Sequence, residues 1–167
     1  TNRKNFLKEL SAAVNQEKPR RQPADKNGKP KLDAEFVADF QFFRDYVTPE
    51  MHKVLRGDER SCFACHGVPG RVPPLTLNRP DDAGYLPVDK MLANYRLLQD
   101  RVDLGNIEKS KLLRTPLNVR TGKEDGHQGG RRYQPMDPGY QIIRRWVLNQ
   151  KKHPAKLGLE VPAKAAP

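Results

Sequence analysis

Cysteine is scarce in this sequence, with two residues in a chain of 167. Two cysteines exclude a disulfide scaffold and a zinc site built from four cysteines. No stretch reaches the roughly 18–20 consecutive apolar residues that a helix needs to cross a bilayer, so we expect no transmembrane segment. The P-loop, G-x-G-x-x-G and G-x-S-x-G patterns are also missing, and we therefore expect that the chain is not an enzyme.

The charge is strongly unbalanced, because 31 lysines and arginines face 20 aspartates and glutamates and leave a formal net charge of +11. Such a chain is attracted to anionic surfaces, with strong dependence on ionic strength. The basic residues are spread from Arg3 to Lys164 with acids between them, and no basic helix or aromatic RNA-binding motif is present. We therefore expect no nucleic-acid partner. A solvated surface is the plain interpretation of this charge, and docking to an acidic protein partner is the more specific one.

The length suits one domain of about 100–150 residues with a tail at each end. Residues 1–32 contain a short amphipathic helix over 3–15, followed by a charged linker rich in proline. We expect them to form an N-terminal arm that is not part of the core and that docks either on a partner or on the flank of the domain itself. The domain itself is predicted to span 33–150. Residues 151–167 are typical of a loose C-terminal tail.

The hydrophobic pattern of the domain favours an all-α fold. Asp33 is a suitable N-cap for a helix whose phenylalanines share one face, and this helix is predicted to stop at Thr48 because Pro49 disfavours helical geometry before it. Further helices are predicted over 89–100, from Ser110, and from Asp137. Long irregular loops connect them, and aromatic residues gather within the helices, which argues against an all-β sandwich.

Residues 62–66, Cys-Phe-Ala-Cys-His, form the C-x-x-C-H pattern of covalent c-type haem attachment. Two cysteines three apart can reach the two vinyl groups of one porphyrin and become thioethers. His66 then lies under the ring and presents a nitrogen to the iron as the proximal ligand. The motif predicts one covalent haem c on Cys62 and Cys65.

Two other interpretations of the motif are weaker. A thioredoxin-like C-x-x-C needs a strand before it and a helix after it, whereas this motif lies between a loop and a proline-rich segment. A zinc site would need two further ligands, such as His127 and His153, whose spacing does not match a zinc finger.

The opposite axial position of the iron has six candidate ligands in the sequence. Four are set aside because they lie beside the proximal ligand, within a helical core pattern or in the tail: Met51, His52, Met91 and His153. Two remain, His127 and Met136. His127 lies in a glycine-rich loop that can approach a ring closely, and Met136 directly precedes the final helix, where it can staple the helix start. We favour His127 and keep Met136 as the alternative.

Several segments resemble the monohaem, class I-like cytochrome c domains common in planctomycetes and related bacteria. FFRDYVTPEMHKVLRGDERSCFACHG is similar to the first half of such domains, and NYRLLQDRV, SKLLRTPL, GHQGGRRY and DPGYQIIRRWV follow in the order of the second half. The similarity covers about residues 36–149. It implies a helical domain around one haem, with Cys62 and Cys65 as attachment points, His66 as proximal ligand and His127 as the loop histidine. The looser pattern has no counterpart for Met136.

We therefore expect a c-type cytochrome that carries single electrons, alone or as a subunit of a larger redox complex. The expected partners are acidic redox proteins or neighbouring subunits. Two alternatives are a haem protein whose open distal site binds a small gas or peroxide, and a structural subunit of a multi-haem assembly that uses residues 1–32 as a strap. Thioether attachment takes place outside the cytoplasm, so we expect a periplasmic or otherwise extracytoplasmic protein. The start at Thr1, without a signal peptide, is expected of a mature or trimmed form.

Overall fold

The regular structure of the chain is helical. A computed structural model describes residues 3–17, 32–54, 61–72, 75–118, 127, 130–154, 156–157 and 159, and no strand occurs among them, in agreement with the all-α prediction. No helix in these ranges is long and apolar enough to cross a membrane. In chain order the elements are α1 (Arg3–Gln16), α2 (Ala34–Phe42), the π-helical segment η2 (Phe43–Val47), α3 (Thr48–His52), α4 (Cys62–His66), α5 (Val88–Gln99), the 3-10 helix η3 (Ile107–Lys109), α6 (Lys111–Leu117) and α7 (Pro138–Lys152).

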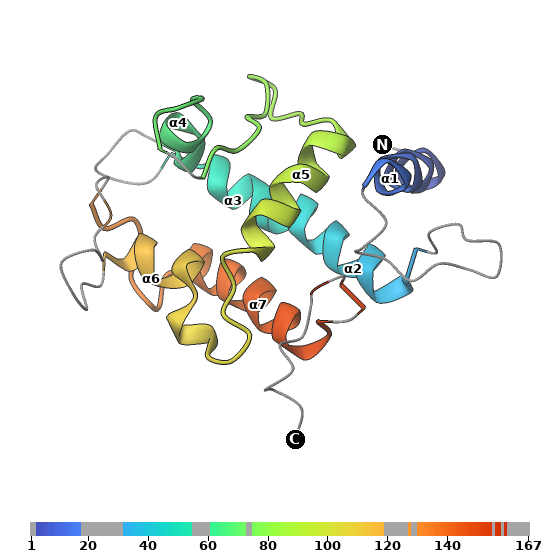
Figure 1. The fold of residues 1–167 in the computed structure, drawn as a ribbon. Helices are drawn as coiled ribbons and strands as arrows, with labels where there is room; N and C mark the ends of the chain where they lie inside the picture. The colour runs from blue at the N-terminus through green and yellow to red at the C-terminus, as the bar shows by residue number, and fades with distance from the viewer. Residues whose placement is uncertain are drawn as a thin grey trace.

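A continuous rod of α2, η2 and α3 runs through the middle of the fold (Figure 1). Asp33 caps its start as predicted, with its side chain accepting a hydrogen bond from the Glu35 backbone at 2.8 Å. The predicted end at Thr48 is wrong, because the chain stays helical to His52. The turn before Pro49 is π-helical and closes with a bond from the Thr48 N–H to the Phe43 carbonyl, and this wider turn gives the proline ring room.

The aromatic core joins this rod to α5 and α7. Tyr95 of α5 meets Phe36, Phe40 and Phe43 edge-on, at ring-centre distances of 5.8, 5.4 and 5.3 Å. Trp146 of α7 packs against Phe43 at 5.2 Å. Both Tyr95 and Trp146 are fully buried in this cluster, so α5 and α7 are held against the same face of the rod.

A buried carboxylate lies inside this core. Asp39 is 4% exposed, and its two oxygens accept hydrogen bonds from four side chains: Tyr95, Trp146, Asn149 and Gln150. These donors come from α5 and α7, whereas Asp39 belongs to α2. One side chain therefore ties three helices together.

The N-terminal helix α1 belongs to the core, which corrects the expectation of an arm outside it. Phe6 and Leu10 are 1% and 0% exposed, and Phe6 stacks on Phe40 at 6.1 Å. The helix packs along α5. The sequence correctly indicated an apolar side on this helix. The charged linker after it suggested that the helix is separate from the domain, but the helix is held against the domain because its apolar side is buried there.

The C-terminal segment is also fastened to the domain. Residues 151 and 152 complete α7, and Leu157 is fully buried, so the described part of the predicted tail is not loose. Arg96 of α5 donates to the Leu157 carbonyl at 2.7 Å and to both carboxylate oxygens of Glu17 at 2.8 and 3.0 Å. This buried arginine holds segments from both ends of the chain.

The later helices lie within about one residue of their predicted starts. Asp137 precedes α7 and Pro138 opens it, as expected. Ser110 precedes α6, but its hydroxyl accepts from the Asp103 backbone at 2.9 Å and does not cap the helix.

Candidate functional site

The C-x-x-C-H residues form the short helix α4. Cys62, Cys65 and His66 are spaced i, i+3 and i+4, so their side chains emerge on the same side of the helix. Both cysteines are free thiols and partly buried, and burial raises the pKa of Cys62 to about 11. Phe63 between them is 1% exposed and packs edge-on against His52. The helix therefore presents two thiols and an imidazole together while Phe63 anchors it to the core.

The His66 ring is held by the extended segment that follows α4. Its Nδ1 lies 3.1 Å from the Leu75 carbonyl, and its own carbonyl accepts from the Leu77 N–H at 2.7 Å. A carbonyl oxygen only accepts, so Nδ1 carries the hydrogen, and Nε2 keeps its lone pair in the neutral ring. Burial is the main cause that lowers the pKa of His66, and this favours the neutral form. Metal-binding histidines are commonly oriented in this way.

His127 is held in an equivalent manner by its own loop. Its Nδ1 lies 2.7 Å from the Gly130 carbonyl, and its backbone N–H donates to the Asn118 side chain at 3.0 Å. Asn118 ends α6 in the left-handed conformation, with φ of 53°, which turns its side chain toward the loop. Gly126 and Gly129, which support the prediction for this loop, lie outside the described residues. His127 therefore also presents Nε2 as the free ring nitrogen.

The structure brings His66 and His127 together, although 60 residues separate them along the chain. Their ring centres are 6.3 Å apart and their planes differ by 14°. An imidazole nitrogen lies about 2.0–2.1 Å from a bound first-row metal and about 1.1–1.2 Å from its own ring centre, so imidazoles on opposite sides of one ion have centres about 6.2–6.6 Å apart. The observed separation of the two ring centres, 6.3 Å, lies within this range.

No protein-family model, curated protein or solved structure matches the chain. What this histidine pair does is therefore inferred from its own geometry and chemistry.

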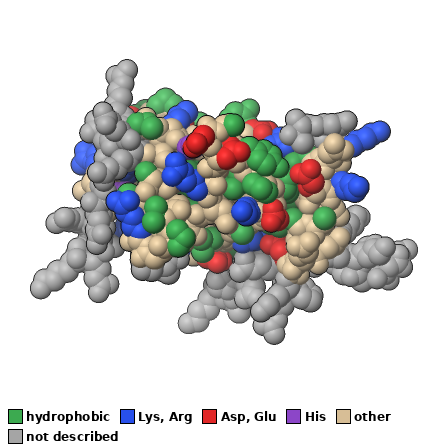
Figure 2. Space-filling view, turned by 90° about the horizontal axis from the view of Figure 1, so that it is seen from above, with side chains coloured by type: hydrophobic (Ala, Val, Ile, Leu, Met, Phe, Trp, Pro, Cys, Tyr) green, Lys and Arg blue, Asp and Glu red, His purple; other side chains and the backbone are tan. Residues whose placement is uncertain are grey.

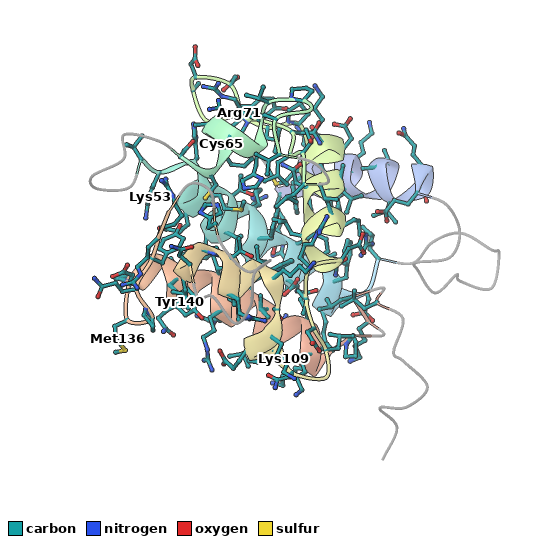
Figure 3. All side chains as sticks on the ribbon, turned by 60° about the vertical axis from the view of Figure 1, so that its left-hand side comes forward. Lys53, Cys65, Arg71, Lys109, Met136 and Tyr140 are labelled. Carbon is teal, nitrogen blue, oxygen red and sulfur yellow. The ribbon has the colours of Figure 1, made fainter. Side chains whose placement is uncertain are left out.

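The other candidate ligands have different surroundings, and His52 packs against Phe63 of α4. Met136 is 85% exposed, and Figure 3 shows it at the edge of the molecule, well away from Cys65. Its side chain does not staple α7, because it is open to solvent. Met51 and Met91 are buried in the core, and His153 pairs with Glu35 at 2.8 Å.

A buried polar atom near Cys62 has no partner in the described part of the chain. Tyr133 is 3% exposed, yet its hydroxyl has no hydrogen-bond partner among the described residues. Burial raises the pKa of Tyr133, with smaller contributions from Cys62 and Glu50 beside it. An unpaired buried hydroxyl costs about 1–3 kcal/mol, which a polar atom of a bound group would offset. Tyr133, a thiol pair and two oriented imidazoles fit a covalent haem.

Haem iron needs only two ligands from the protein, since the porphyrin supplies four. No group of three or more histidine, cysteine, aspartate or glutamate side chains suited to a metal ion occurs in the described ranges.

Several supporting residues could not be identified from the sequence. Asn118 positions His127, and the Pro116 carbonyl near the end of α6 accepts from the backbone of Arg132 and Tyr133 at 2.7 and 3.2 Å. An asparagine after a short helix was an available signal, because asparagine often ends helices in the left-handed conformation. The role of the Leu75 carbonyl had no sequence signal, since any residue supplies one.

The start of α7 lies tightly against α3 beside this site. A Cβ on Gly139 would clash with the Glu50 Oε1 atom and would lie 3.0 Å from the Tyr133 ring. Glycine to alanine within a helix usually stabilises by up to about 1 kcal/mol, but overpacking costs about 1–3 kcal/mol. We expect Gly139→Ala to lower the free energy of unfolding by about 1–2 kcal/mol, measured by urea denaturation.

The same experiment includes Glu50→Ala as its relief variant. If the clash with Glu50 causes the loss, Gly139→Ala costs less in the Glu50→Ala background, with a coupling of about 1 kcal/mol. A Gly139→Ala variant more stable than the parent would contradict the close packing.

Proposed function

We propose that the chain is a c-type cytochrome that carries single electrons through one covalently attached haem, with His66 and His127 as its axial ligands. The observation that carries the proposal is the pair of imidazoles 6.3 Å apart, with each Nδ1 atom beside a backbone carbonyl. The resemblance to monohaem cytochrome c domains points in the same direction.

The residues of the chain have separate tasks in this proposal. Haem c, when bound, supplies an iron that gains and loses one electron. Cys62 and Cys65 hold the group by thioether bonds, and the Leu75 and Gly130 carbonyls keep the two imidazoles in fixed orientations. Buried Phe63 and Tyr133 keep water away from the attachment helix. Fixed ligands suit electron transfer, because little has to move between the two oxidation states.

The ligand pair also sets the direction of the reduction potential. Methionine as the second ligand raises the potential of a haem, so two imidazoles are expected to give a lower potential than a histidine–methionine pair. An oxidised spectrum with a methionine-ligand charge-transfer band would contradict ligation by His127.

Acidic redox proteins, or neighbouring subunits of a redox complex, are the proposed partners. Figure 2 shows lysines and arginines interspersed with acids on the displayed face, in keeping with a net charge of +11. Such a charge steers an acidic partner toward the chain, and salt weakens the steering. Because thioether attachment takes place outside the cytoplasm, we place the protein in the periplasm or another extracytoplasmic site.

Covalent attachment gives the direct test of this function. When the chain is exported by a host that attaches haem to C-x-x-C-H motifs, its intact mass is expected to exceed the amino-acid sum by one haem. The pyridine haemochrome spectrum should be that of a haem with two thioethers. In Cys65→Ala, the remaining Cys62 thioether should shift this spectrum to that of a single thioether.

Ser61→Ala is the matched control, because Ser61 lies next to the motif and its side chain does not cap α4. It should leave both mass and spectrum unchanged. A colourless chain whose mass equals the sum of its amino acids would refute the proposal. Prompt carbon monoxide binding by the reduced parent would instead favour the alternative with an open distal site.

A further inference from the structure

A concave surface lies between α2 and α7, apart from the candidate haem site. It is a groove of about 610 Å³, within the range typical of binding sites. The residues that line it include Ala38 and Phe42 from α2 and Arg145, Leu148, Lys151 and Lys152 from α7. In Figure 1 the first half of α2 and the last half of α7 lie at the end of the molecule opposite α4. The groove is thus remote from His66 and the two cysteines.

The α7 wall of this groove carries positive charge without matching acids. Within the described residues, neither Arg145 nor Lys152 makes an ion pair, and Arg145 lies over the Phe42 ring at 5.0 Å. Lys151 makes one long hydrogen bond, at 3.4 Å, to a backbone carbonyl.

The two acids that line the groove already have partners inside the domain, although the Glu35 Oε2 atom accepts no hydrogen bond among the described residues. Glu35 pairs with His153 at 2.8 Å and with Lys156 at 2.5 Å. Asp39 lies beneath the surface and accepts its four hydrogen bonds there. The charge that remains available to a partner at this surface is therefore positive.

Apolar side chains run between these charges. Leu148 is 40% exposed, and it lies three residues after Arg145 and four before Lys152, so the three share one face of α7. On the other side the Phe42 ring packs against the tilted ring of Tyr46, with centres 4.9 Å apart, and Tyr46 is 54% exposed. Exposed Ala38 lies between the two helices and leaves room for a close approach. Along α7 the groove thus presents three side chains in a row: basic Arg145, apolar Leu148 and basic Lys152.

We propose that this groove binds an acidic amphipathic helix of a partner protein. A helix with acids seven residues apart and leucines between them would place the acids opposite Arg145 and Lys152 and the leucines against Leu148 and Phe42. This is the general way in which an amphipathic helix is recognised by a groove. The inference goes beyond electron transfer and does not depend on the haem. It gives the chain an anchoring surface at one end and leaves the histidine end free.

The test uses a dye-labelled synthetic helix of about 15 residues that carries this acid–leucine pattern, and a scrambled peptide of the same composition. Fluorescence anisotropy measures binding to the full chain as purified, whether or not it carries a haem. The patterned peptide is expected to bind at least about tenfold more tightly than the scrambled one. The double variant Arg145→Glu with Lys152→Glu is expected to weaken binding about tenfold or more, and Leu148→Ala about threefold.

Lys90→Glu with Lys109→Glu is the matched control, because it changes the net charge equally at exposed positions outside the groove. It should weaken binding by less than about twofold, with unchanged helix content in every variant. Equal loss in both double variants, or equal binding of the scrambled peptide, would overturn the proposal in favour of unspecific attraction. Self-association of the chain that Leu148→Ala abolishes would overturn it in favour of a second copy in the groove.

Discussion

Replacing His127 with alanine is expected to open the haem iron to external ligands. Under the proposed function, His127 occupies the second axial position in most molecules, and its ring is already held by the Gly130 carbonyl. If the position is free in about 0.1–10% of molecules, removal of the histidine strengthens carbon monoxide binding by the inverse of that fraction, about 10- to 1,000-fold. The reduced spectrum should change from low-spin to high-spin at the same time. Carbon monoxide titration of the reduced protein measures the effect.

Met136→Leu is the matched comparison for this experiment. Met136 is the alternative ligand from the sequence, and it is 85% exposed, so its loss should change neither stability nor carbon monoxide binding. The opposite pattern, in which Met136→Leu opens the iron and His127→Ala does not, would assign the ligand to Met136. Imidazole added to His127→Ala should restore the low-spin spectrum, which separates loss of a ligand from loss of the fold.

Asp39→Asn is expected to give the largest loss of stability in the chain. The Asp39 carboxylate accepts from Tyr95 at 2.6 Å, Trp146 at 3.0 Å and Gln150 at 2.8 Å, and also from Asn149. Asparagine brings an NH2 group against these donors and leaves some of them unpaired. A buried donor left without an acceptor costs about 1–3 kcal/mol, which corresponds to a fall in Tm of roughly 2–12 °C for a chain of this size.

Asp45→Asn is the control for this substitution. Asp45 is exposed and pairs with its neighbour Arg44, and such a pair contributes less than about 1 kcal/mol. Equal losses from Asp39→Asn and Asp45→Asn would contradict a central role for the buried carboxylate.

The contribution of Asp39 to the free energy of unfolding should also depend on pH. Burial is the main cause that raises the pKa of Asp39 in the folded chain, while hydrogen bonds led by that of Tyr95 act in the opposite direction. Because the pKa of Asp39 is higher in the folded chain than in the unfolded chain, the protonated carboxyl favours folding. This stabilisation is fully present below the pKa of the unfolded state and is lost as the pH rises through the pKa of the folded state. The parent should therefore lose stability just above the ordinary aspartate range, and Asp39→Asn should lack this loss. Urea denaturation at a series of pH values measures the difference.

Local signals account for much of the fold. Asp33 before a phenylalanine face, Pro138 after Asp137, and the apolar pattern within residues 89–100 are properties of neighbouring residues, and they predicted α2, α7 and α5. The C-x-x-C-H motif depends only on five consecutive residues, so its position was evident. Attachment of a haem there, and ligation by His127, stay predictions.

The remaining features depend on contacts between distant residues. The approach of His127 to His66 depends on the left-handed turn at Asn118, whose side chain accepts from the His127 backbone nine residues later. Asp39 carried no sign of burial, because its donors lie 56 to 111 residues away. Burial of α1 likewise depends on α5, which no pattern within residues 3–16 reveals.

Arg96 makes the two chain ends interdependent. Its guanidinium is shared between Glu17 and the Leu157 carbonyl, and it is only 6% exposed. Shortening the protein from either terminus would therefore strip a partner from a cation that has little water around it, and the surviving terminus would loosen with it. Fusions and truncations are best designed to retain residues 3–17 and 156–157 as one set, since neither can be trimmed without disturbing the attachment of the other.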